Sequence, residues 1–246
     1  GCQNHCLAHS EPYPALLASE KITAERLATI AERACCAGLS FTYNEPTVWL
    51  EYTIEAAQAA HEKGLLATYV SNGMMSEEAL RELISCIDAF RFDIKAFDNE
   101  KLREISKFGD CEQARKNAEF VINAGRHLEI VTNVIPGVND DEKHGAEIAG
   151  WIAKNLGAHV PWHLTKFTPS YKLDYLTPTS LKTLERLIDV GREAGLEYVY
   201  IGNIPGHPMQ STYCPSCGEL AVEREGFFVT RVTLENGRCV RCGRTI

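Results

Sequence analysis

The chain has 246 residues, a formal net charge of −8, and 45% hydrophobic and 24% charged residues. These are ordinary values for a globular protein and exclude disordered and fibrous classes, and the length suits one α/β barrel with a small appendage. The acidic charge argues against a nucleic-acid partner, and no apolar run reaches the ~18 residues of a membrane span. No secretion signal follows Gly1, so a cytoplasmic location is expected.

Six apolar segments rich in β-branched or aromatic residues predict strands, at 39–43, 66–70, 89–94, 128–135, 160–167 and 198–201. Segments with helical apolar spacing lie between them, at 27–34, 80–87, 114–122 and 181–188. Ser76 and Thr177-Pro178 are expected to begin helices, and glycines to close them before strands, at Gly64, Gly125, Gly157 and Gly195. This β-then-α alternation predicts an α/β fold whose parallel strands form a partial (β/α) TIM-type barrel, with ligand groups at the carboxyl ends of the strands.

The alternation stops near residue 208, where the chain becomes rich in cysteine. We therefore expect two domains, a barrel at 1–208 and a small metal-binding module at 209–246. The module contains two C-x2-C pairs, each followed by glycine, and its cysteines are Cys214, Cys217, Cys239 and Cys242.

Two C-x2-C pairs in a long chain without a secretion signal point to a metal site and not to disulfides. They predict a tetrahedral four-cysteine site of zinc-ribbon or rubredoxin type. Zinc is favoured over iron, because iron would imply electron transfer for which no other feature of the module argues. So short a module is expected to need its metal to fold. The remaining internal cysteines lack such spacing and are expected to be small buried apolar residues, namely Cys35, Cys36, Cys86 and Cys111.

Polar motifs follow three of the predicted strands. Tyr43-Asn44-Glu45-Pro46 follows the first, where it is either a ligand-binding turn or an ordinary strand-to-helix turn. Ser71-Asn72-Gly73 follows the second, with short side chains able to hydrogen-bond a ribose or a carboxylate and a glycine that frees the backbone to turn. Asp93 and Lys95 end the third; two residues apart on a strand, they share one face and need each other or a ligand.

The fourth and fifth strands carry further candidates. Glu129, Val131 and Asn133 share one face of the fourth strand, and the motif 136–140 (Pro-Gly-Val-Asn-Asp) follows it. His163 lies in the fifth strand, where a single histidine can be structural or functional.

The N-terminal segment has two interpretations. Cys2, Cys6 and His9 have C-x3-C-x2-H spacing, which could hold a metal by itself. Alternatively Cys2-Gln3-Asn4 is the tail of a longer cysteine loop.

These motifs occur in an order that resembles the radical S-adenosylmethionine (SAM) component of the AmmeMemoRadiSam system, which is related to the pyruvate formate-lyase activating enzymes. The resemblance rests on Cys2-Gln3-Asn4, 41–47, 70–73, 93–95, 136–140, 165–169, 198–203 and the terminal four-cysteine module. It implies a 4Fe-4S cluster held by a C-x3-C-x2-C loop, of which Cys2 would be the third ligand and a catalytic residue. The other two cysteines would then stand upstream of Gly1, so the chain is expected to be truncated at its N-terminus.

The resemblance also assigns the cosubstrate site. Glu45 would engage the methionine ammonium group of SAM, although Tyr43-Asn44 stands where the superfamily motif usually has two glycines. His163 stands where activating enzymes carry a similar strand end. The residues expected to bind SAM are Asn44, Glu45, Ser71, Asn72, Asp93, Lys95, Asn133 and His163.

The implied activity is reductive cleavage of SAM to a 5'-deoxyadenosyl radical that abstracts hydrogen from an unidentified substrate, with a protein as one candidate. The implied partners are an electron donor such as flavodoxin or ferredoxin and the other AmmeMemoRadiSam proteins. Two alternatives remain open. One is a cluster-independent TIM-barrel lyase or aldolase that uses Asp93, Lys95 and His163 as acid, base or Schiff-base groups. The other is a zinc-ribbon binding module on an inert barrel.

Overall fold

Residues 20–107, 109–226 and 228–246 are described by a computed structural model of the chain. Cys2, Cys6 and His9 therefore lie outside the described residues. Six strands form one sheet in the sequence order β1 to β6, which confirms the expected α/β architecture. The chain folds as two compact units, residues 1–129 and 130–246, and each is described by itself.

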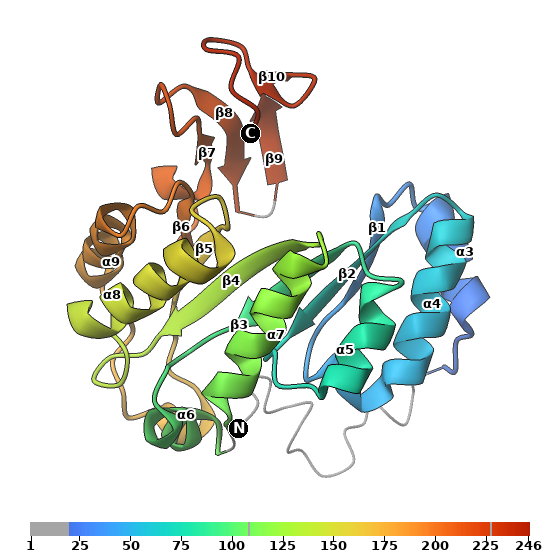
Figure 1. Cartoon of the computed structure of the whole chain (residues 1–246), viewed down its shortest axis with the longest axis horizontal. Helices are drawn as coiled ribbons and strands as arrows, with labels where there is room; N and C mark the ends of the chain where they lie inside the picture. The colour runs from blue at the N-terminus through green and yellow to red at the C-terminus, as the bar shows by residue number, and fades with distance from the viewer. Residues whose placement is uncertain (1–19, 108, 227) are drawn as a thin grey trace. The chain divides into compact units, whose positions relative to one another are not determined.

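The first unit contains three parallel strands, β1 (Gly38–Phe41), β2 (Leu66–Ser71) and β3 (Ala89–Asp93). Its helices α4, α5 and α7 cover one face of these strands, and α3 packs on α4 (Figure 1). The helices are α3 (Ala24–Arg33), α4 (Leu50–Glu62), α5 (Glu77–Ile84), α6 (Asn99–Ser106) and α7 (Cys111–Asn123), with a 3-10 turn at Pro46–Trp49.

The helix-covered face of this sheet is aromatic. The register pairs Phe41 with Tyr69 and Tyr69 with Phe90, and all three side chains are buried. The rings of Tyr69 and Phe90 lie 6.0 Å apart between centroids. The alternate residues Arg91 and Asp93 project from the other, less buried face. The polar groups at the ends of these strands are therefore supported by a packed layer of buried aromatic side chains.

The second unit holds most of β4 (His127–Val134), then β5 (Trp162–Lys166) and β6 (Val199–Gly202), again parallel. Helix α8 (Glu142–Trp151) continues into a π-helical turn, Ile152–Leu156, and packs on α9 (Leu181–Glu193), which covers β5 and β6 (Figure 1). A Cβ atom at Gly191 would lie 3.1 Å from the indole of Trp162. Glycine at this position lets α9 approach the buried indole closely.

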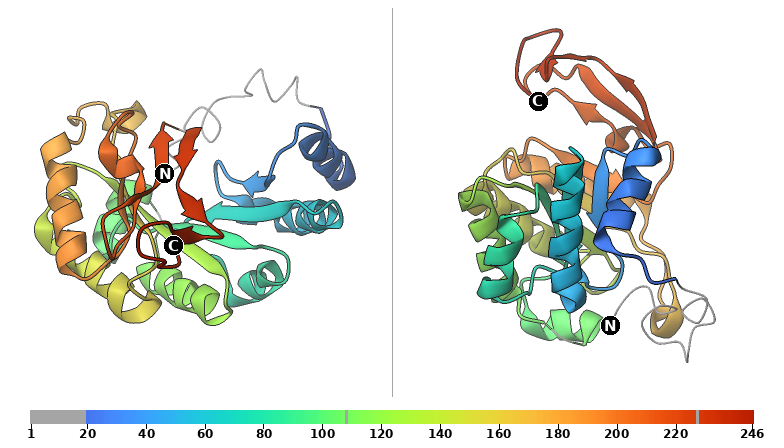
Figure 2. Two further views of the ribbon diagram at one scale, coloured as in Figure 1. Left: turned by 90° about the horizontal axis from the view of Figure 1, so that it is seen from above. Right: turned by 90° about the vertical axis from the view of Figure 1, so that its right-hand side faces the viewer.

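A second, smaller sheet follows the 3-10 turn Pro208–Gln210. Strands β7 (Thr212–Tyr213), β8 (Leu220–Glu225) and β9 (Phe228–Val232) are antiparallel and separate from β4–β6 (Figure 2). Strands β10 (Leu234–Glu235) and β11 (Arg238–Cys239) form a hairpin whose turn, Asn236-Gly237, has φ values of 51° and 73°. The domain boundary near residue 208 stays a prediction.

The helix punctuation is confirmed at most positions. Ser76 caps α5 by accepting a hydrogen bond from Ala79 N, and the four predicted closing glycines all have positive φ. Thr177-Pro178, however, does not begin a helix, because the cap of α9 is Ser180. The Thr179 hydroxyl contacts Val134 O and accepts from Phe167 N, which anchors this segment to the end of β4 and delays the helix.

Two of the four isolated cysteines also differ from expectation. Cys86 and Cys111 are buried as predicted, whereas Cys35 and Cys36 are exposed. The reason is their place just past the end of α3, where the chain turns away from the helix's buried face. Cys35 has a φ of 54°, which is a left-handed conformation. The residues in the same conformation just past the ends of α4 and α7 are glycines, Gly64 and Gly125. Within the described residues, no helix is both long and apolar enough to cross a bilayer.

The strained backbone at Cys35 gives a stability prediction. For a residue with a side chain, this conformation costs about 1–2 kcal/mol. Glycine does not have this cost, but it loses more backbone entropy on folding, which offsets part of the gain. We expect Cys35→Gly to raise the free energy of unfolding by about 0.5–1 kcal/mol in urea denaturation. Cys36→Gly is the matched control, since Cys36 does not have a positive φ, and it should not stabilise. A less stable Cys35→Gly protein would contradict the argument.

Candidate functional site

The turn after β1 reverses the chain through two consecutive left-handed residues. Tyr43 has a φ of 61° and Asn44 a φ of 54°, a conformation that glycine adopts freely and tyrosine does not. The Tyr43 ring gains little from burial there, because it is 67% exposed. The backbone shape itself is therefore what the turn maintains, and it delivers Glu45 to the end of β1.

The Glu45 carboxylate connects the ends of β1 and β2. Its Oε1 accepts from Thr47 Oγ1 at 2.6 Å, from Ser71 Oγ at 2.8 Å and from Thr47 N at 3.3 Å. Its Oε2 accepts from Asn72 N at 3.0 Å. Glu45, Ser71 and Asn72, three residues expected to share a site, are thus brought together.

Ser71-Asn72-Gly73 forms a tightly hydrogen-bonded turn. Ser71 Oγ accepts from Gly73 N at 3.1 Å, and Asn72 Oδ1 accepts from Met74 N at 2.8 Å. Gly73 has a φ of 75°, and a Cβ there would lie 3.0 Å from the Phe92 ring. The prediction that Gly73 lets the backbone turn is confirmed. The buried Ser71 hydroxyl donates a hydrogen bond to Glu45.

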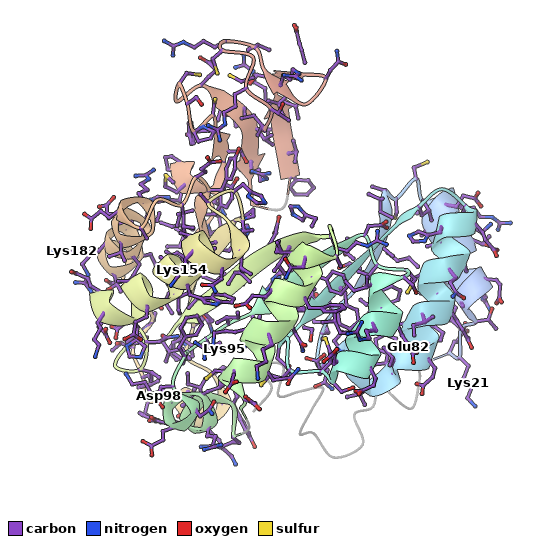
Figure 3. The ribbon with its side chains drawn as sticks, viewed as in Figure 1. Lys21, Glu82, Lys95, Asp98, Lys154 and Lys182 are labelled. Carbon is purple, nitrogen blue, oxygen red and sulfur yellow. The ribbon has the colours of Figure 1, made fainter. Side chains whose placement is uncertain are left out.

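Three charged side chains occupy alternate positions at the end of β3. Asp93 accepts from Arg91 Nη2 at 3.1 Å and pairs with Lys95 Nζ at 3.4 Å. The shared face expected for Asp93 and Lys95 is confirmed, and Arg91 joins it by the same two-residue spacing. Lys95, 14% exposed, lies in the segment that leaves β3 for α6 (Figure 3).

The two groups lie at neighbouring strand ends of the first unit. Ser71, the last residue of β2, is paired with Phe92, so Asp93 follows one residue further along β3. Glu45, Ser71 and Asp93 therefore meet the expectation that polar groups gather at the carboxyl ends of the strands.

In the second unit, Asn133 is 6% exposed and its Oδ1 accepts from Thr165 Oγ1 at 3.4 Å on the adjacent strand. The turn after β4 is built around Asn139. Its Nδ2 donates to Asn133 O at 3.0 Å, and its Oδ1 accepts from Ile135 N at 2.6 Å. Asn139 thus stabilises the turn that Pro136 and Gly137 begin.

His163 lies within the fifth strand, as expected. It is the second residue of β5 and stacks on Tyr200 of β6, with ring centroids 4.9 Å apart. The strand begins only at Trp162, because that buried indole, which donates to Thr132 Oγ1 at 3.0 Å, sets the register. The end of β5 is occupied instead by Thr165 and Lys166.

The four C-terminal cysteines form one cluster. Their sulfurs all lie within 4.8 Å of one another, with 3.5 Å between Cys214 and Cys242 and 3.6 Å between Cys217 and Cys239. Thiolates about 2.3 Å from a tetrahedral zinc ion lie about 3.8 Å apart. The cluster therefore fits a single tetrahedral metal ion, as the spacing predicted.

Backbone amides prepare the cluster for a metal. Burial opposes ionisation of Cys214, but hydrogen bonds from the backbone amides of Ser216 and Cys217 and from the thiols of Cys242 and Cys217 outweigh it and lower the pKa of this thiol to about 7. At Cys217 the backbone amide of Glu219 acts to lower the pKa, but burial and hydrogen bonds to the other three sulfurs outweigh it and raise the pKa. Gly218 and Gly243 close the two loops with φ values of 72° and 75°. The thiolate is the form that binds metal, so the first loop favours the binding state at Cys214.

The module around the cluster has almost no apolar core. Across 211–226 and 228–246, Ala221 is the one fully buried hydrophobic residue besides Cys214 and Cys239. Every described residue of β9 is exposed. A bound metal would thus supply the cohesion that other small domains obtain from packed side chains.

Arg244 ties both cysteine loops to the segment before β6. Its guanidinium donates to Ser216 Oγ at 2.9 Å, inside the first loop, and to Glu197 Oε1 at 2.6 Å. Its own backbone oxygen accepts from Cys239 N at 2.8 Å. The position of this side chain therefore depends on both loops being closed.

Together these features describe an α/β protein of partial-barrel type, with polar groups at the carboxyl ends of its strands and a four-cysteine cluster near its C-terminus. The radical SAM superfamily profile matches residues 2–147, more than half of the chain. The chain belongs to the radical SAM superfamily, whose members use SAM and an iron–sulfur cluster.

Three comparisons accompany this assignment. The whole chain is 33% identical to an uncharacterised protein of Methanocaldococcus jannaschii, of which it covers 72%. A domain of a pyruvate formate-lyase activating enzyme from Bacteroides vulgatus has a TM-score of 0.59 at 23% identity, over 68% of this chain and 99% of that one. SuiB of Streptococcus suis, bound to SAM, has a TM-score of 0.60 at 15% identity, over 75% of this chain and 44% of that one. The two structures support the fold.

Sequence reasoning missed three residues of these sites. Arg91 could have been found from its two-residue spacing to Asp93. Thr47 follows Glu45 by two residues, a spacing at which a hydroxyl can reach the carboxylate of a turn. Tyr69 carries no such signal, because in sequence it is one more aromatic residue of a buried strand.

The metal centre gives the next prediction. We expect Cys239→Ser, which removes one buried ligand, to abolish stoichiometric metal binding and to remove amide-exchange protection across 211–246, while α8 and α9 stay protected. Cys36→Ser, at an exposed cysteine, is the control and should leave both unchanged. Retained protection in 211–246 without metal would show that the module folds unaided.

Proposed function

We propose that this protein is a radical SAM oxidoreductase that cleaves SAM reductively, so that a 5'-deoxyadenosyl radical abstracts hydrogen from its substrate. The observation that carries the proposal is the turn after β1, within the family match. It adopts at Tyr43-Asn44 the backbone that two glycines would favour and presents Glu45 at the strand end. The finer assignment that we propose is the radical SAM component of the AmmeMemoRadiSam system, with a protein as candidate substrate.

An iron–sulfur cluster held by three cysteines would, once reduced, pass on the electron that breaks the sulfonium carbon–sulfur bond and releases methionine. We propose Cys2 as one of the cysteine ligands of this cluster, and the match to the family begins at this residue. We propose flavodoxin or ferredoxin as the electron donor and the other AmmeMemoRadiSam proteins as partners.

The first unit's charges complement the methionine part of SAM, which carries an ammonium and a carboxylate. Glu45 and Asp93 offer acceptors for the ammonium group and for ribose hydroxyls, and Lys95 offers a cation for the carboxylate. Asn44 precedes Glu45 in the turn, and Asn72 donates its backbone N–H to the Glu45 carboxylate. Ser71, buried and bonded to Glu45, would act by orienting that carboxylate and not by touching SAM.

The roles of Asn133 and His163 of the second unit as SAM ligands stay predictions. Asn133 is buried and bonded to Thr165, and the position of His163 early in β5 gives no support to a ligand role. The lyase alternative loses support too, because a Schiff-base lysine must be neutral and Lys95 is ion-paired with Asp93.

For the four-cysteine centre we propose structural zinc. The sulfur spacing suits either zinc or iron. Because the module has almost no apolar core, we expect the metal to hold its two loops together, and zinc does this without redox chemistry. Elemental analysis of the anaerobically purified protein tests the choice of metal.

The activity is tested with protein from the complete reading frame, reconstituted anaerobically with iron and sulfide. We expect a brown protein that forms 5'-deoxyadenosine from SAM on reduction with dithionite. Asp93→Asn should weaken SAM binding about 10-fold or more, because hydrogen bonds to a charged group contribute about 1.5–3 kcal/mol.

Glu112→Gln is the control, since Glu112 lies in an exposed ion pair on α7 and should not affect binding. A reconstituted wild-type protein that neither binds nor cleaves SAM would refute the proposed function. Unchanged SAM affinity in Asp93→Asn would refute the role given to Asp93.

A further inference from the structure

The Glu45 carboxylate is held by a chain of hydroxyl groups that reaches into the buried core of the first unit. From this arrangement we infer that Thr47 and Tyr69 are positioning residues, which fix the orientation of Glu45 for the ammonium group of SAM. The inference rests on the proposed function, because it takes SAM as the ligand. It assigns roles to two residues that do not themselves belong to the polar strand-end motifs.

The direction of the hydrogen bonds follows from their chemistry. An ionised carboxylate can only accept, so Thr47 Oγ1 donates its single proton to Glu45 Oε1, 2.6 Å away. Thr47 must then accept at its 2.8 Å contact with Tyr69 Oη. The chain of donors therefore runs from Tyr69 to Thr47 to Glu45.

Tyr69 is suited to begin this chain. It is fully buried, and burial, with the nearby Glu45 charge as a smaller cause, raises the pKa of its hydroxyl. The tyrosine therefore stays protonated and remains a donor. Its ring packs against Phe90, 6.0 Å away between centroids. A donor anchored in a packed aromatic layer has little freedom to move.

The two oxygens of Glu45 have different environments. Oε1 accepts from three donors, which are Thr47 Oγ1, Thr47 N and Ser71 Oγ, whereas within the described residues Oε2 accepts from one, Asn72 N. A carboxylate has about four acceptor positions. Oε1 is therefore committed to the protein, and Oε2 is the atom placed to accept a proton from the ligand's ammonium group.

This arrangement matters because Glu45 lies on a turn and not within a strand. A glutamate side chain free to rotate would lose conformational entropy when it binds, which lowers affinity. With Oε1 fixed by Thr47 and Ser71, that cost is met during folding. The hydroxyl chain thus makes Glu45 a preorganised acceptor.

Two Thr47 variants of similar size test the inference. Thr47→Val removes the hydroxyl, whereas Thr47→Ser keeps it. Binding is measured on the reconstituted protein with SAM and with 5'-methylthioadenosine, which lacks the ammonium and carboxylate groups. We expect Thr47→Val to bind SAM about 10-fold more weakly and 5'-methylthioadenosine as the wild type does. Thr47→Ser should retain wild-type affinity for both.

Tyr69→Phe provides a second variant that keeps the ring in the core. We expect about a 3-fold loss for SAM and none for 5'-methylthioadenosine, because Thr47 can still donate to Glu45 but is no longer held by Tyr69. Equal SAM affinity in wild type and Thr47→Val would overturn the inference. Equal losses for both ligands would also overturn it, since they would show a structural role alone. Wild-type protein that fails to bind SAM would instead refute the proposed function.

Discussion

A carboxylate partly withdrawn from water must find donors, and the strand ends of the first unit are arranged around that requirement at Glu45. Donors come from Thr47, two positions later, and from the end of the neighbouring strand, at Ser71 and Asn72. Each bond to a charged group contributes about 1.5–3 kcal/mol when its partner would otherwise be left unpaired. One side chain thus joins two loops, and the parallel register of β1 and β2 is what brings them within its reach.

The C-terminal module meets a different constraint in a different way. With Ala221 as its one buried hydrophobic residue beyond two cysteines in the described part of 211–246, it cannot rely on the hydrophobic effect. Its organisation comes from thiolates, from amide groups aimed at them, and from Arg244, which joins both cysteine loops to Glu197. The chain therefore combines a sheet stabilised by packing with a module that the proposed metal would stabilise by coordination.

The sequence predicted the strands well, because buried parallel strands are continuous runs of β-branched and aromatic residues. It did not predict the helical segments of α4, α6 and α8. The buried face of α4, for example, is built from small residues such as Ala56 and Ala60 and so shows little apolar contrast. The Cys2 assignments lie outside the described residues. The predicted start of α9 was wrong, because a long-range contact of Thr179 with Val134 sets it, and such a contact leaves no local pattern.

The turn at Tyr43-Asn44 also bears on how such a site can diverge. Two glycines would adopt the left-handed shape of this turn without steric cost. Here two residues with side chains hold the same shape, against a cost of about 1–2 kcal/mol for the tyrosine. Glu45 is then held at the end of this turn by Thr47 and by the neighbouring strand, so the site needs the backbone shape of the turn and not particular side chains at these two positions. A motif search that requires two glycines would therefore overlook a chain such as this one, which reaches the same geometry with other residues.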